Sequence, residues 1–147
     1  LALTFLPPPH AQKRRRAEYR LPKLADTSID NTTPMTYAYR MLIVETSVFT
    51  RRIGDCMSDE EYRALQMLLV GNPASGNVIP GGGGLRKLRW SGLGRGKRGG
   101  TRIIYYWWVP ETLFMLFPYL KNETEDLTTD QVRQLKAVVE EWLHEEK

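Results

Sequence analysis

The stretch RIIYYWWVPETLFMLFPYL, residues 102–120, contains two runs of β-branched, aromatic and aliphatic residues separated by Pro110-Glu111. Such runs favour β-strands, and a tight connection between them predicts an antiparallel hairpin. We therefore expect strands at residues 102–109 and 113–120. Because proline has no amide hydrogen to donate, Pro118 is expected at a sheet edge or at a bulge.

The residues just before this hairpin alternate with the period of two that is typical of a strand. In the strand expected over residues 86–91, Lys87 and Arg89 share one face, and Arg86 lies on the other. The loop over residues 92–100 would join this strand to the next one. The face that Arg102 occupies depends on the register between the two strands, which the sequence leaves open.

Two capping boxes, Ser58-Asp59-Glu60-Glu61 and Thr128-Thr129-Asp130-Gln131, mark the starts of helices. Apolar residues follow each box at helical spacing: Tyr62, Leu65, Leu68 and Leu69 after the first, and Val132, Leu135, Val139 and Trp142 after the second. Gly71-Asn72-Pro73 ends the first helix. The second helix is expected to pack its apolar stripe on the sheet.

A short strand at residues 39–44 and a short helix at 46–53 are expected before the first capping box, and a loop over 74–84 after its helix. The resulting order is strand-helix-helix-strand-strand-strand-helix. This order predicts an α+β fold in which helices flank a small antiparallel sheet.

Residues 1–34 contain a run of three prolines and the basic cluster Lys13-Arg14-Arg15-Arg16, with no hydrophobic periodicity. We expect this segment to be disordered or a non-functional extension, and residues 35–147 to form one domain that starts at Met35. The alternatives for the basic cluster are a nuclear or nucleic-acid patch and part of a transit peptide.

Positive charge is concentrated in one part of the chain. The formal net charge is +4, but residues 80–102 carry seven Lys and Arg and no acid, whereas residues 120–147 carry four against eight acids. A cationic segment of this kind indicates a polyanionic partner. The alternative is a solvated basic loop.

Several familiar sites are excluded by their context. Residues 94–99 match G-x-G-x-x-G, but they precede a strand, whereas a dinucleotide site opens a helix. A phosphate-binding P-loop fails because Arg98 follows Gly96-Lys97 and Ser91 holds the place of the first glycine.

The chain also lacks the residues for metal or serine-hydrolase chemistry. His10 and His144 are far apart in the sequence, and no cluster has metal-ligand spacing, so we expect no metal and no cofactor. Cys56 is the one cysteine; it excludes an internal disulfide, fits a reducing cytosol and is expected to be structural or incidental rather than a nucleophile.

What remains is a cationic set: Lys87, Arg89, Lys97, Arg98, Arg102 and Lys121. RNA can be cut by its own 2′-hydroxyl, which needs a base and stabilisation of the charge on the phosphate. Arginine suits the second task, and a lysine crowded by cations can serve as base. The aromatic residues 105–108 could stack on bases, but in so apolar a strand we expect them in the core.

Four segments together resemble the RelE/ParE superfamily of bacterial toxins, and most closely its HigB branch. They are GGLRKLRW at 83–90, GKRGGTRIIYYWW at 96–108, YLKNE at 119–123 and LTTDQVRQLKAVVEEW at 127–142. The resemblance covers roughly residues 39–143. It implies a bacterial, cytoplasmic toxin of a type II toxin–antitoxin system that cleaves translated mRNA on the ribosome without a metal ion. It also implies a cognate antitoxin of the helix-turn-helix, HigA-like kind, through which the complex could reach operator DNA.

By position in the family motifs, Lys87, Arg89 and Arg102 would be catalytic residues, and Lys97 is the alternative to Lys87 as base. The residues contacting RNA or the ribosome would be Arg86, Arg95, Arg98 and Lys121. Asn122 and Leu127 stand where some relatives carry arginine and tyrosine, so the resemblance names no general acid. Two alternatives share the fold or the charge: a ParE-like toxin that inhibits gyrase, and an RNA-binding module without activity.

Overall fold

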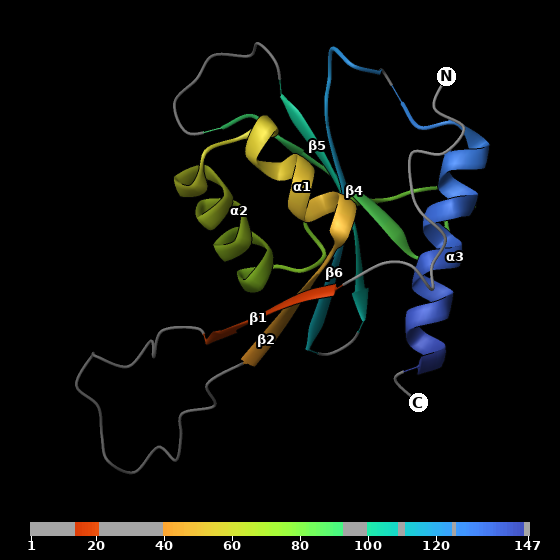
Figure 1. The fold of residues 1–147 in the computed structure, drawn as a ribbon, viewed down its shortest axis with the longest axis horizontal. Coiled ribbons are helices and arrows are strands. Elements are labelled where there is room, and N and C mark those ends of the chain that lie inside the picture. Colours follow the sequence, from red (N-terminus) through yellow and green to blue (C-terminus); the bar gives the residue numbers. More distant parts are fainter. Residues whose placement is uncertain (1–13, 21–39, 93–99, 109–110, 125, 146–147) are drawn as a thin grey trace.

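The computed structural model describes residues 14–20, 40–92, 100–108, 111–124 and 126–145. Strands among these residues form one six-stranded sheet in the spatial order β1-β2-β6-β5-β4-β3 (Figure 1). Their bounds are β1 Arg14–Arg20, β2 Arg40–Thr46, β3 Asn77–Val78, β4 Leu85–Trp90, β5 Thr101–Trp108 and β6 Thr112–Leu120. The helices are α1 Ser47–Cys56, α2 Asp59–Gly71 and α3 Thr129–Glu145. The predicted α+β class, with helices flanking the sheet, is confirmed.

The predicted hairpins are present, because β4, β5 and β6 pair antiparallel in succession. The register of β5 on β6 shifts at Ile104/Tyr105, which leaves Leu116 as an extra residue on β6. Pro118 pairs with β5 alone, since β2 meets β6 only over residues 112–115. The missing amide of Pro118 therefore faces no strand, and the expectation of an edge or bulge position is confirmed.

Three pairings differ from the expected sheet. β2 joins β6 in parallel, so the sheet is mixed rather than wholly antiparallel. β1 pairs antiparallel with β2, which corrects the expectation of disorder for residues 14–20, and β3 forms within the predicted loop. The apolar pattern of β1 and β3 is weak. β2 and β6 are both apolar, and for them only the pairing was not expected. The boundary at residue 35 stays a prediction.

Side-chain caps fix where the helices begin. The Ser58 hydroxyl accepts from the Glu61 amide at 3.1 Å. At α3 the exchange is reciprocal: the Thr128 hydroxyl accepts from the Gln131 amide at 3.1 Å, and the Gln131 side chain accepts from the Thr128 amide at 2.9 Å. Both predicted helix starts are confirmed, and α2 ends at Gly71 as expected.

The helices cover opposite faces of the sheet (Figure 1), and each face has its own core. On the α3 side, Trp142 packs on Phe114 with ring centroids 4.8 Å apart. On the α1 and α2 side, Phe49, Leu65 and Tyr105 are fully buried. The aromatic residues of β5 alternate between the two cores, so their predicted place in the core is confirmed. None of the described helices is long and apolar enough to cross a membrane.

A glycine turn sets the start of β4. The Ile79 amide donates to the Leu85 carbonyl at 2.8 Å, which closes the turn. Gly81 and Gly84 have φ of 74° and 104°, in the region that L side chains rarely adopt. At Gly84 a Cβ would also lie 2.8 Å from Cε2 of Tyr106, whereas at Gly81 nothing lies within 4 Å. The turn therefore needs both backbone freedom and space at Gly84.

These two glycines should respond differently to alanine. Gly81→Ala introduces only backbone strain, so we expect the free energy of unfolding to fall by about 1–2 kcal/mol. Gly84→Ala adds a collision with the Tyr106 ring and should lower it further. Urea denaturation measures both changes; equal losses would show that the Tyr106 contact has no effect on stability.

Candidate functional site

The strand register brings three side chains into one row. Arg89 lies opposite Arg102 across β4 and β5, and Arg102 lies opposite Tyr119 across β5 and β6. Residues directly opposite each other share a face of the sheet, with Cβ atoms roughly 4.5–5.5 Å apart. Tyr119 belongs to the core on the α3 side, so the row lies on that face. Lys87, two residues before Arg89, lies on the same face, as the alternation predicted.

Lys87, Arg89 and Arg102 form what we call the cationic cluster. The Lys87 ammonium binds the Asp126 carboxylate at 3.0 Å. Among the described residues, neither Arg89 nor Arg102 pairs with a carboxylate. Like charges directly opposite each other destabilise a sheet, so an anion bound between the two arginines would relieve their repulsion.

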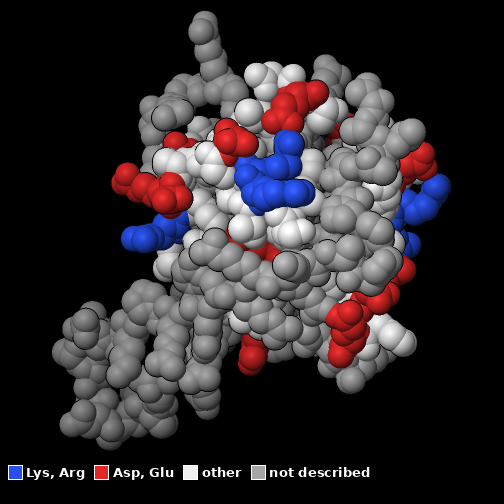
Figure 2. Space-filling model, in the orientation of Figure 1, with Lys and Arg blue, Asp and Glu red and all other residues white. Residues whose placement is uncertain are grey.

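Basic residues elsewhere are differently placed. Figure 2 shows Lys and Arg side chains over α1 next to acidic ones. There Arg52 binds Glu123 at 2.6 Å and lies 4.7 Å from the centre of the Phe117 ring. Its charge is therefore balanced within the protein, whereas Arg89 and Arg102 have no carboxylate partner among the residues that the structure describes.

The Arg102 guanidinium lies against the backbone of Gly100, just before β5. A Cβ on Gly100 would lie 3.1 Å from Nη1 of Arg102 and 3.4 Å from the Trp90 carbonyl oxygen. The absence of a side chain at residue 100 thus leaves the space that the guanidinium occupies.

Asp126 belongs to the connection between β6 and α3 and is missing from the sequence-predicted set. Its side chain is 70% exposed, and its carboxylate also accepts from the Leu127 amide at 3.0 Å. The hydrogen bond from Lys87 is the main cause that lowers the pKa of Asp126 below its ordinary value of 3.8. The contact joins residues 39 positions apart in the sequence, so no local sequence pattern could predict it.

Tyr119 is a second residue that the sequence-based prediction missed. The residue is fully buried, yet its hydroxyl has no hydrogen-bond partner among the described residues. The pKa of Tyr119 is raised to about 12, mainly by burial and less by Asp126, while Arg102 and Arg89 act to lower it. The signal lay in the β5–β6 register, which a bulge shifts and which the sequence did not reveal.

The remaining predicted residues lie apart from the cluster or outside the described residues. Arg86 is on the opposite face, as its alternation predicted, and its guanidinium donates to the Gly76 carbonyl at 2.8 Å. Lys121 is exposed just after β6, where its amide donates to the Gly100 carbonyl at 3.0 Å. Arg95, Lys97 and Arg98 lie outside the described residues.

Cys56 shows no sign of activation as a nucleophile. Burial is the largest influence on the thiol and raises its pKa, although the nearby Arg52 lowers it. A raised pKa reduces the thiolate fraction, which agrees with the expected structural role.

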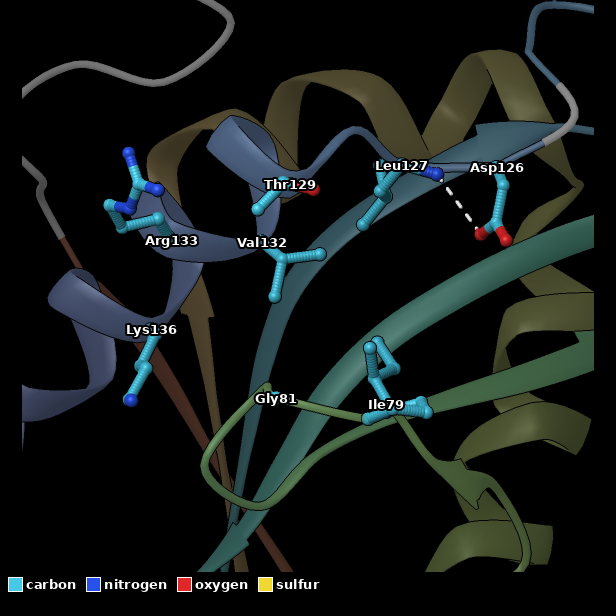
Figure 3. Close-up of a pocket in the computed structure, with 9 residues that line it drawn as sticks. Ile79, Gly81, Asp126, Leu127, Thr129, Val132, Arg133 and Lys136 are labelled. Atoms are coloured by element: carbon cyan, nitrogen blue, oxygen red, sulfur yellow. Dashed lines mark hydrogen bonds between the residues drawn. The ribbon is translucent and has the colours of Figure 1, made fainter.

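A pocket of about 430 Å³ lies beside Asp126, between the glycine turn and the first turns of α3 (Figure 3). Ile79 and Val132 lie in its middle part, with Asp126 at one end and Arg133 and Lys136 at the other. The Asp126 carboxylate therefore borders open space as well as Lys87.

The ion pair makes stability depend on pH in a defined direction. Because the pKa of Asp126 is lower in the folded state, the pair stabilises the fold above about pH 4, and this contribution is lost as the pH falls through the folded-state pKa. The Asp126 side chain is largely exposed, so Asp126→Asn should reduce the free energy of unfolding by at most about 1 kcal/mol at pH 7. Denaturation over a series of pH values from about 7 down to about 2 measures how this contribution changes.

The control is the same substitution in a Lys87→Met background. There the Asp126→Asn effect should shrink at neutral pH, since the partner is gone. An undiminished effect would assign the stabilisation to the Leu127 amide instead.

The family model for the RelE toxin of the RelE/RelB toxin–antitoxin system matches residues 73–147, just over half of the chain. The matched region includes the whole cationic cluster, Tyr119, Asp126 and α3. A toxin of such a system has a cognate antitoxin as its partner. The chain belongs to the RelE toxin family.

Proposed function

We propose that this protein is an endoribonuclease of the HigB branch that cleaves mRNA during translation on the ribosome. The observation that supports this most is the pair Arg89 and Arg102, set face to face with no carboxylate between them among the described residues. Two guanidinium groups can bind two oxygens of one phosphate group. The partners would be the ribosome, mRNA and a HigA-like helix-turn-helix antitoxin, through which the complex would reach operator DNA, all in the bacterial cytoplasm.

The proposed reaction uses the RNA as its own nucleophile. The 2′-oxygen forms a bond to the adjacent phosphorus, and the bond from phosphorus to the 5′-oxygen breaks. The departing 5′-oxygen takes a proton from water, so the products are a 2′,3′-cyclic phosphate and a 5′-hydroxyl. Arg89 and Arg102 stabilise the added negative charge on the phosphate oxygens. Lys87 is the proposed base. It would first separate from Asp126 and lose a proton from its ammonium group, and the resulting amine would then take the proton of the 2′-hydroxyl. Lys97 is the alternative base.

The other basic residues are assigned by position. Lys121, Arg95 and Arg98 are proposed to contact mRNA or ribosomal RNA. Arg86 is removed from this group because its guanidinium holds backbone carbonyls on the opposite face of the sheet. The ribosome would supply the orientation of the RNA that a small cluster of cations lacks.

Replacing either arginine of the facing pair should abolish most cleavage without unfolding the protein. We expect Arg102→Ala and Arg89→Ala to lower the cleavage rate roughly 10²- to 10³-fold, as for other groups that stabilise transition-state charge. The melting temperature should stay equal or rise, since each substitution removes a like-charge repulsion. Primer extension on a message translated in vitro measures cleavage.

Arg63→Ala is the matched control, since Arg63 is an exposed arginine on α2, outside the cluster. The same message with initiation blocked tests dependence on the ribosome. Wild-type rates from Arg102→Ala would refute the site. Gyrase-dependent DNA breaks without RNA cuts would favour the ParE-like alternative, and salt-sensitive binding to intact RNA would favour a module without activity.

Gly100 offers a subtler change at the same site. Gly100→Ala adds a methyl group within contact of the Arg102 guanidinium, which must shift by a few tenths of an ångström. We expect the cleavage rate to fall about tenfold, since small displacements of a catalytic group have large effects. Thermal unfolding should show no loss of stability. An unchanged rate would show that Gly100 does not set the position of Arg102.

A further inference from the structure

Two tyrosines on neighbouring strands are both fully buried, but their hydroxyls differ in hydrogen bonding. The Tyr105 hydroxyl, on the α1 and α2 side, donates to the Pro73 carbonyl at 2.6 Å and accepts from the Gly76 amide at 2.8 Å. The Tyr119 hydroxyl, on the α3 side, has no partner among the described residues. A buried hydroxyl normally has a partner, so Tyr119 needs an explanation that packing alone does not supply.

The surroundings of the Tyr119 hydroxyl point to an anion as the missing partner. Tyr119 lies directly opposite Arg102, which itself lies opposite Arg89, so the two guanidinium groups are its neighbours on this face. Their charges and that of Asp126 act on the hydroxyl. An anion held by the arginines would therefore lie within reach of a third donor.

Asp126 is the group that a phosphate would have to displace to reach the cationic cluster. Its carboxylate binds the Lys87 ammonium of the cluster at 3.0 Å. Because the side chain is mostly exposed and borders the pocket at the start of α3, it can leave Lys87 without displacing packed atoms. An incoming phosphate, bound by the two arginines, would take the place of this carboxylate near the cluster.

We propose that Tyr119 is a further catalytic residue, whose hydroxyl donates a hydrogen bond to a non-bridging oxygen of the scissile phosphate after that phosphate has displaced Asp126. This inference rests on the proposed nuclease function. The hydroxyl stays protonated at neutral pH because its pKa is raised, so it acts as a neutral donor and transfers no proton. Its hydrogen bond would strengthen as negative charge develops on the phosphate oxygens.

The test is Tyr119→Phe, which keeps the ring in the core and removes only the hydroxyl. We expect cleavage of a translated message to fall roughly 10- to 100-fold, the effect of a lost hydrogen bond to a charged group. The loss should be the same factor at every pH from about 6 to 9, well below the raised pKa. The melting temperature should not fall, since the hydroxyl has no partner to lose.

Tyr105→Phe is the matched control. It removes a hydroxyl with two partners, so it should lower the melting temperature and leave the rate per folded molecule unchanged. Wild-type cleavage by Tyr119→Phe, or a loss that varies with pH, overturns the role of Tyr119 while the proposed function stands on wild type and Arg102→Ala. If wild type itself leaves the translated message intact, the proposed function fails and this inference with it.

Discussion

The pairing of β4 with β5 places two arginines directly opposite each other, and the rest of the site follows from that register. Like charges so placed cost a few tenths to about 1 kcal/mol. The same pairing buries Ile103 and Ile104 completely, one on each face of the sheet, and burial of each such side chain contributes about 1.5–3 kcal/mol. Packing therefore outweighs repulsion, and the apolar part of β5 holds Arg102 where its charge is least favourable.

Local features of the fold were predictable because nearby residues encode them. The capping residues Ser58 and Thr128, the hairpin around residue 110 and the position of Pro118 each depend on a few neighbouring side chains. The parallel pairing of β2 with β6 joins residues about seventy positions apart, and no periodicity reports on such a contact. β1 was not predicted because its sequence is mostly basic, without the apolar alternation of a half-buried strand. Its strand is defined by backbone pairing with β2 instead.

The site residues also divide into those that a local sequence pattern predicted and those that only the three-dimensional structure revealed. That Lys87 and Arg89 share a face follows from alternation along one strand, but the place of Arg102 required the register. Tyr119 depended on two registers and a bulge, and Asp126 on the path of the connection into α3. Residue types alone favoured the cations, since cations are what phosphate chemistry needs. The neutral donor and the competing carboxylate become visible only when side chains from β4, β6 and that connection are seen together.

Hydrogen bonding elsewhere in the core makes the exception at Tyr119 informative. The buried Glu45 carboxylate accepts from the Thr50 hydroxyl at 2.7 Å and from the Tyr62 hydroxyl at 2.5 Å. An unsatisfied buried hydroxyl lowers the stability of the fold by about 1–3 kcal/mol. The Lys87–Asp126 pair, whose carboxylate is exposed, raises it by at most about 1 kcal/mol. Among its described residues, the free protein thus has a buried hydroxyl without a hydrogen-bond partner and two guanidinium groups without a carboxylate partner, close to a weak ion pair. Binding one phosphate would satisfy all three, so the balance of free energy favours a substrate that brings its own charge and a partner that orients it.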